Sequence, residues 1–280
     1  MLTRAAKRSA RTAIWLTALA ALVGLAALLL LTPSTQAGSA SRSGAAKPTV
    51  VLVHGAWADA SGWSEVIKRL QKDGYRVLAP AIPLRSLEGD VGYLRSILAQ
   101  EEGPFVLVGH SYGGAVITNA AAGNPDVNAL VYVDGFVPDT GEDILHLAGE
   151  DSLVPSSIEF KGFPPFGPTD VDIYIKQDSF RETLAGDLSK KDAAVLAATQ
   201  RPLSLAAASG PTTATAWKTI PSWYLLGTED RTITPAAQRF MAERAGATIE
   251  EVKASHLSLI SRSGKVAGLI EEAAAASGHG

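Results

Sequence analysis

The stretch FVLVGHSYGGA, residues 105–115, places a serine between a short apolar run and a run of small residues. The apolar run, residues 105–108, predicts a buried strand, and the small residues predict the start of a helix. Gly109 and Gly113 flank Ser111 in the pattern G-x-S-x-G, the nucleophile elbow, in which a serine occupies a sharp turn from strand to helix. Glycine suits both flanks, because a Cβ there would collide with neighbouring chain. We therefore predict a nucleophilic Ser111; the alternative interpretation is a serine that only caps the helix.

The segments on both sides of this stretch alternate short apolar strands with helices. Apolar and β-branched runs predict strands at residues 49–53, 76–79, 105–108, 129–133, 222–226 and 248–252. Helical spacing and capping residues predict helices at residues 63–70, 91–100, 235–245 and 265–276, besides the one after Ser111. This alternation is typical of a parallel sheet covered by helices on both faces. The expected fold class is α/β, with six parallel strands in one core.

The alternation stops between residues 136 and 220. This span holds several short helical patterns, residues 185–196 among them, but no clear buried strand. We interpret it as a helical cap insertion over the C-terminal ends of the strands, where open α/β sheets bind ligands. Phe160, Phe163 and Phe166 suggest an apolar binding surface in this cap; the alternative is that they form its own core.

Residues 1–37 have the layout of a secretory signal peptide. A basic head precedes an apolar run at residues 13–31 and a small polar end that finishes at Ala37. The run is longer than the roughly 7–15 residues of a typical signal core and approaches the roughly 20 that span a bilayer. Two interpretations stay open, namely cleavage with secretion and retention as a membrane anchor. Residues 38–47 then form a linker, and residues 48–280 form one domain.

Composition argues against several classes of protein. The chain of 280 residues has no cysteine, which excludes disulfides and thiolate metal sites. Without the four basic residues of the head, 21 Lys and Arg remain against 28 Asp and Glu, a net charge of about −7. No basic cluster stands out, so we do not expect a nucleic acid partner. A membrane contact is expected only through residues 13–31.

A serine hydroxyl at neutral pH needs a base within hydrogen-bond reach and a carboxylate that orients this base. With this elbow, the expected order along the chain is serine, acid and then histidine. His256 is the candidate base, because it follows a late strand on a short loop. The other histidines precede the serine or lie in the insertion or the tail: His54, His110, His146 and His279.

Three carboxylates are candidates for the orienting acid. Asp230 lies in the loop that follows the strand at residues 222–226, and it is our first choice. Its neighbour Glu229 is the second, and Asp134, at the end of the strand before the insertion, is the third. A turn or capping role is the alternative for each, since loop carboxylates commonly have one.

Acyl transfer also needs N–H donors aimed at the oxyanion that develops during attack. In elbow enzymes one donor is the backbone amide after the nucleophile, here Tyr112. The loop after the first strand reads His54-Gly55-Ala56 and offers the amide of Ala56. A plain tight turn at His54-Gly55 is the alternative, and it is compatible with this role.

Four motifs together resemble the α/β-hydrolase superfamily: HGAW at 54–57, GHSYGG at 109–114, GTED at 227–230 and SH at 255–256. The short loop with a tryptophan and the modest insertion are similar to the branch of plant methylesterases, hydroxynitrile lyases and many bacterial esterases. The resemblance extends over residues 49–276. It implies the α/β-hydrolase fold, with Ser111 as nucleophile, His256 as base, Asp230 as orienting acid, and the amides of Ala56 and Tyr112 as oxyanion donors.

Two departures from the wider superfamily narrow the expected chemistry. Hydroxynitrile lyases of this branch have a lysine directly after the histidine, whereas this chain has Leu257, which disfavours cyanohydrin chemistry. Epoxide hydrolases and haloalkane dehalogenases have aspartate at the elbow, so Ser111 argues against both.

We therefore expect an exported serine hydrolase that cleaves small carboxylic esters, with lactones as a further option, through an acyl-enzyme. This chemistry needs no metal and no organic cofactor. Two alternatives remain. The first is a different reaction with the same residues, as in perhydrolases, haloperoxidases and some C–C bond hydrolases. The second is an anchored binding module whose triad is not catalytic.

Overall fold

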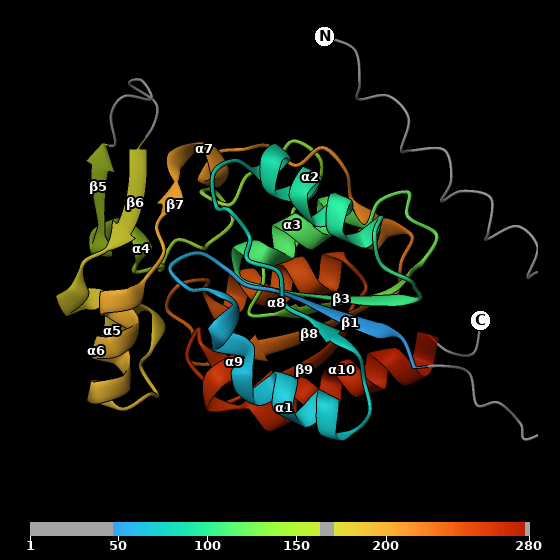
Figure 1. The fold of residues 1–280 in the computed structure, drawn as a ribbon. Helices are drawn as coiled ribbons and strands as arrows, with labels where there is room; N and C mark the ends of the chain where they lie inside the picture. Colours follow the sequence, from blue (N-terminus) through green and yellow to red (C-terminus); the bar gives the residue numbers. More distant parts are fainter. Residues whose placement is uncertain (1–46, 163–170, 278–280) are drawn as a thin grey trace, which may run out of the picture. The chain divides into compact units, whose positions relative to one another are not determined.

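The structure is a computed structural model that describes residues 47–162 and 171–277 (Figure 1). Its centre is a six-stranded sheet with the order β2-β1-β3-β4-β8-β9, in which every neighbouring pair is parallel. The strands are β1 (Thr49–Val53), β2 (Val77–Leu78), β3 (Phe105–His110), β4 (Val127–Val133), β8 (Ser222–Gly227) and β9 (Thr248–Val252). The predicted α/β class and the six parallel strands are confirmed.

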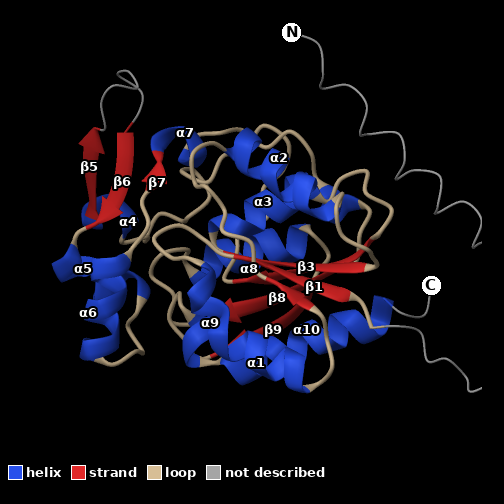
Figure 2. Ribbon diagram, viewed as in Figure 1, coloured by secondary structure: helices blue, strands red, loops and turns tan. Residues whose placement is uncertain are grey.

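Helices cover both faces of this sheet (Figure 2). One face carries α2 (Leu87–Leu98), α3 (Tyr112–Ala120) and α8 (Pro235–Arg244), and the other carries α1 (Ser64–Lys72), α9 (Ser258–Ser261) and α10 (Ser263–Ser277). Short 3-10 turns lie at Ala60–Trp63 and Ala216–Lys218. Capping residues mark several helix ends. Ser86 caps the start of α2, Thr234 caps the start of α8 in front of a proline, and Gly74 follows the end of α1 with a φ of +81°. Every residue of β1 and β3 is buried between the two helical layers, as expected for central strands of a parallel sheet.

The cap, residues 136–220, contains a second sheet as well as helices. Its helices are α4 (Val154–Ser157), α5 (Gln177–Leu184), α6 (Lys190–Thr199) and α7 (Leu205–Ala208). Its strands are β5 (Ile158–Gly162), β6 (Val171–Ile175) and β7 (Leu203–Ser204), paired antiparallel in the order β5-β6-β7. In Figure 1 these strands stand at the left, above α5 and α6.

This small sheet is what the sequence analysis omitted. The strand predictions rest on buried apolar runs, whereas β5 is only half-buried at its start and exposed at its end. The helix expected at residues 185–196 begins at Lys190, because Ser189 caps it by accepting a hydrogen bond from the Asp192 N–H.

Several predictions fall on residues outside the described ranges. They concern residues 1–37, with the apolar run 13–31 and the cleavage site at Ala37, all of the linker 38–47 but its last residue, and Phe163, Phe166 and His279. Phe160 is described, and the residue is 59% exposed, so it does not form a core of the cap. Within the described ranges, no helix combines the length and the apolar character that a membrane span requires.

Candidate active site

Ser111 occupies the turn between β3 and α3, with φ at +52° and ψ at −124°. This left-handed backbone is strained for a residue with a side chain and is typical of functional turns. The flanking glycines are needed for space, since a Cβ on Gly109 would lie 2.6 Å from the carbonyl oxygen of Gly113. A Cβ on Gly55 would likewise lie 2.6 Å from the Cβ of Ser111. The loop after β1 thus packs directly against the serine.

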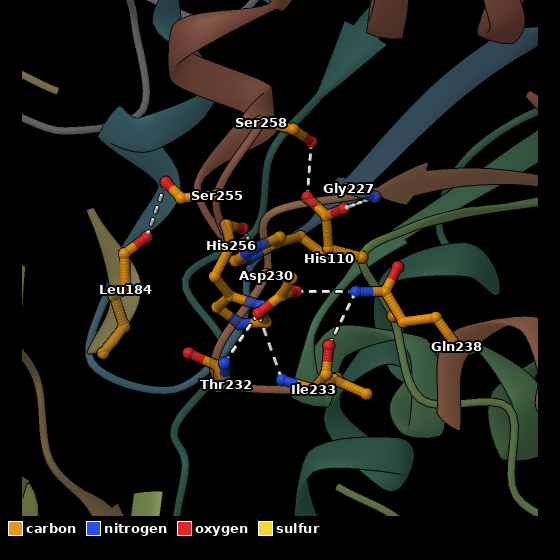
Figure 3. A network of polar contacts seen from close by, with 12 residues as sticks. His110, Leu184, Gly227, Asp230, Thr232, Ile233, Gln238, Ser255, His256 and Ser258 are labelled. Atoms are coloured by element: carbon orange, nitrogen blue, oxygen red, sulfur yellow. Dashed lines mark hydrogen bonds and ion pairs between the residues drawn. The ribbon is translucent and has the colours of Figure 1, made fainter. Parts of the chain in front are cut away.

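His256 and Asp230 meet at the C-terminal end of the sheet (Figure 3). The imidazole Nδ1–H of His256 donates to Asp230 Oδ2 at 2.7 Å, and both side chains are buried. The amides of Thr232 and Ile233 donate to Asp230 Oδ1 at 2.7 and 3.1 Å, and Gln238 Nε2 donates to Oδ2 at 2.7 Å. These donors fix the carboxylate in the orientation in which it holds the imidazole.

Burial shifts the pKa of both members of this pair. It lowers the pKa of His256 to about 3, so the imidazole is neutral at neutral pH and able to accept a proton. Burial also raises the pKa of the Asp230 carboxyl, whereas the N–H donors from Thr232, Ile233 and Gln238 favour its charged form.

The other two candidate acids have different partners. Glu229 forms a partly exposed ion pair with Lys253 at 3.5 Å. Asp134 is fully buried, but it accepts from the Gly227 amide at 2.8 Å and from the Ser258 hydroxyl. Burial, reinforced by the nearby Asp230, raises the pKa of Asp134 well above its ordinary value. Of the three candidates, Asp230 is the one bonded to His256.

His110, directly before Ser111, connects the elbow to the loop of His256. Its Nε2–H donates to the backbone carbonyl of His256 at 2.9 Å, and the two rings lie 4.9 Å apart. Burial holds the pKa of His110 well below its usual value, so this ring is neutral. His110 therefore has a structural role, which its place in the sequence did not indicate.

The remaining described histidines lie apart from this arrangement. His54 donates from Nδ1 to the Gly55 carbonyl at 2.9 Å and accepts at Nε2 from the Ile82 amide at 3.0 Å. Burial lowers its pKa, which suits this neutral bridging role. His146 is exposed and bonded to Asp143.

A cavity of about 250 Å³ opens beside Ser111. Ala56 and Tyr112, the two predicted oxyanion residues, both line it together with Ser111. The phenol of Tyr112 donates to Asp90 at 2.7 Å, and the residue is the first of α3, where helix N–H groups lack helical partners. The cap supplies most of the apolar wall: Ile144, Leu145, Val154, Pro155, Ile158 and Ile173. No charged side chain belongs to the described lining.

The structure also shows residues that the sequence analysis missed. Gln238 and Thr232 hold the Asp230 carboxylate, and Trp57, with φ at +56°, ties the loop after β1 to the cap through Nε1–H and the Ile173 carbonyl at 2.9 Å. Of these residues, only the tryptophan belongs to a motif that the sequence analysis quotes. Among residues 47–162 and 171–277, no group of three or more His, Asp or Glu is placed to hold a metal ion.

Comparison with known families matches residues 50–269 to the sequence model of the family described as alpha/beta hydrolase. A carbendazim hydrolyzing esterase of Nocardioides sp. is 39% identical over 125 residues, which are 40% of this chain and 52% of that protein. A pyrethroid hydrolase of Sphingobium wenxiniae is 34% identical over 110 residues, 32% of this chain and 39% of that protein. The matched part is thus about half of the first relative and about two fifths of the second.

Solved structures share the fold over most of the described chain. The crystal structure of polyneuridine aldehyde esterase superposes with a TM-score of 0.72 at 18% identity, covering 81% of this chain and 98% of that one. At this level of identity the likeness concerns the fold alone.

Proposed function

The chain belongs to the alpha/beta hydrolase family, and from this premise we propose that it hydrolyses carboxylic esters through an acyl-enzyme on Ser111. One observation carries the proposal: in a buried Asp230–His256 pair, joined at 2.7 Å, the imidazole lies 4.9 Å from the ring of His110, directly before the strained Ser111 that lines an apolar cavity. The names of the two partial relatives, an esterase and a hydrolase, support it.

In the proposed mechanism, neutral His256 takes the proton of the Ser111 hydroxyl at Nε2 while the serine oxygen attacks the ester carbonyl. Asp230 keeps Nδ1 protonated and stabilises the imidazolium that forms. The amides of Ala56 and Tyr112 stabilise the oxyanion. The imidazolium then protonates the leaving alcohol, and a water deprotonated by the same histidine releases the acid. In each of these steps His256 is the residue that accepts or returns the proton.

The cavity indicates the kind of ester. Its wall is apolar, and its described lining has no charged side chain to pair with a charge on the substrate. An acyl group that carries a charge would be buried there without a partner, which costs several kcal/mol. We therefore propose neutral esters with apolar acyl groups as substrates, and neutral lactones meet the same requirement.

A matched pair of esters tests this proposal. The substrates are p-nitrophenyl hexanoate and the p-nitrophenyl monoester of adipic acid, which has a carboxylate in place of the terminal methyl group. We expect turnover of the hexanoate and a kcat/KM at least about a hundredfold lower for the charged ester, because its burial is unpaired. Equal rates for the two esters would contradict the substrate class, and turnover of neither would contradict ester hydrolysis.

We also propose that the chain is exported, either released after Ala37 or held by residues 13–31 as an anchor. The basic head and the apolar run that follows it support this proposal. Mass spectrometry of the chain from producing cells distinguishes the two forms: release predicts an N-terminus at Gly38, and anchoring predicts an intact chain in the membrane fraction. An intact chain in the cytosol would contradict export.

A further inference from the structure

The C-terminal end of α5, in the cap, contacts the two loops that carry Asp230 and His256. We call residues 228–234, between β8 and α8, the acid loop, and residues 253–257, between β9 and α9, the histidine loop. The last carbonyls of a helix have no partner within it and need donors from elsewhere. In α5, two consecutive carbonyls of this kind, Thr183 and Leu184, each face a hydroxyl from one of these loops.

Thr232 makes the contact from the acid loop. Its Oγ1–H donates to the Thr183 carbonyl at 2.8 Å, and its backbone N–H donates to Asp230 Oδ1 at 2.7 Å. The residue is only 3% exposed, so water does not readily replace either bond. One residue therefore links the cap directly to the carboxylate that orients His256.

Ser255, directly before His256, makes the contact from the histidine loop. Its hydroxyl lies 3.2 Å from the Leu184 carbonyl (Figure 3) and also contacts a carboxylate oxygen of Asp187. A hydroxyl has one proton, so it donates to one acceptor at a time. Both acceptors belong to the cap, and Arg262 lies 3.8 Å from the other carboxylate oxygen of Asp187.

A second segment of the cap, before α4, also bonds to the acid loop. The Leu153 amide donates to the Arg231 carbonyl at 2.9 Å, and the Ser152 hydroxyl donates to the Thr232 carbonyl at 2.7 Å. Thr232 is therefore fixed to the cap through its side chain and its backbone.

We propose that the cap positions the catalytic pair, and that Thr232 and Ser255 are positioning residues whose hydroxyls hold the acid loop and the histidine loop to the same end of α5. This inference rests on the proposed ester hydrolysis by Ser111, His256 and Asp230. The bond between Asp230 and His256 joins two separate loops. Its geometry therefore depends on contacts that hold the two loops in fixed positions relative to each other. The Thr183 carbonyl holds the acid loop, and the Leu184 carbonyl together with the Asp187 carboxylate holds the histidine loop, so the cap is more than a wall of the cavity.

Loss of either hydroxyl leaves a buried carbonyl without its donor, and the loop shifts to relieve this. A displacement of about 1 Å between catalytic groups costs on the order of a hundredfold in rate. Asp230 and His256, the displaced groups, act in proton transfer and do not line the cavity, whereas Thr232 does line it. Valine keeps the shape of Thr232, so the loss falls on kcat and leaves KM nearly unchanged.

Four variants separate positioning from a general effect on stability. Thr232→Val keeps the shape of the side chain and removes the hydroxyl, whereas Thr232→Ser keeps the hydroxyl. Ser255→Ala removes the hydroxyl of the histidine loop. Thr118→Val is the matched control, because Thr118 is a fully buried threonine of α3 whose hydroxyl bonds the Tyr132 phenol at 2.9 Å, outside both loops.

Two measurements apply to each variant: steady-state hydrolysis of p-nitrophenyl hexanoate and the downfield proton resonance of His256 Nδ1–H. We expect kcat to fall about tenfold to a hundredfold in Thr232→Val and Ser255→Ala, with KM within about twofold. Thr232→Ser returns kcat to within about threefold of wild type, and Thr118→Val keeps the wild-type kcat even where its Tm falls. The resonance broadens in Thr232→Val and Ser255→Ala alone, because the Asp230–His256 bond loosens in these two variants.

The outcomes distinguish this inference from the proposed function. Wild-type kcat and an unchanged resonance in Thr232→Val and Ser255→Ala overturn the positioning role, while ester hydrolysis stands. A wild-type chain that hydrolyses no ester overturns the proposed function, and the resonance of the variants then decides the positioning role by itself. The two variants change different loops, so either one serves if the other does not fold.

Discussion

His256 acts as a base only while its imidazole is neutral, so its pKa sets the lower pH limit of the reaction. Burial lowers this pKa from 6.5 to about 3. A lowered pKa means that the protein takes up the inactivating proton only as the pH falls far below 6.5. We expect kcat/KM for a neutral ester to stay level from about pH 8 to about pH 5 and to decline below that.

Hydrolysis of p-nitrophenyl hexanoate, followed at the isosbestic wavelength of the released phenol, measures this profile. Far-UV circular dichroism at each pH separates protonation of His256 from acid unfolding. A midpoint near pH 6.5 in a chain that is still folded would contradict a buried, neutral imidazole.

At the scale of single residues, the sequence predicted what a local pattern encodes. Ser111 lies in a recognisable turn, and His256 follows from its place after a late strand. The choice between Glu229 and Asp230 depended on the path of the loop, which the sequence does not show. In the structure the Thr232 amide donates to the Asp230 carboxylate, which is buried. Gln238, Thr232 and Ser255 were missed as supporting residues, because each acts through contacts between segments that are distant in the chain.

At the scale of elements, the turn from β3 to α3 depends on the absence of a side chain at Gly109. A Cβ there would lie 2.6 Å from a backbone carbonyl oxygen, which cannot move without shifting α3. We expect Gly109→Ala to lower the free energy of unfolding by about 3 kcal/mol. Gly268→Ala is the matched control, because Gly268 lies in α10 and, apart from its chain neighbours and the nearby backbone of its own helix, no atom lies within 4 Å of its would-be Cβ.

Urea unfolding followed by circular dichroism measures both changes. Gly268→Ala is expected to raise the free energy of unfolding by about 0.5–1 kcal/mol, since alanine favours the helix. Equal destabilisation by the two variants would show that the loss of any glycine has this effect, and a stable Gly109→Ala would contradict the close packing at the elbow.

The elements of the main sheet were predictable because their strands are buried apolar runs between helices. The cap strands were not, for a physical reason. β5 and β6 are only partly buried, and their register comes from antiparallel pairing with each other, which no single segment shows. The contact of α5 with the acid and histidine loops was equally hidden, because it joins carbonyls of one element to hydroxyls of two others.

At the scale of the whole molecule, the parallel sheet brings together residues that are far apart in the sequence. Ser111 follows β3, Asp230 follows β8 and His256 follows β9, and all three lie beyond the carboxyl ends of their strands. The cap then closes an apolar cavity over the serine. Topology brings these residues to one edge of the sheet, whereas the cap accounts for the kind of ester proposed and, in our proposal, for the positions of Asp230 and His256.

The central claim is ester hydrolysis through an acyl-enzyme on Ser111. Its most direct test compares the hydrolysis of p-nitrophenyl hexanoate by the chain without residues 1–37 and by Ser111→Ala made in the same way. We expect turnover by the wild type and a loss of several orders of magnitude in kcat for the variant, as its nucleophile is removed. Equal rates for the two folded chains, or no turnover by either, would contradict the claim.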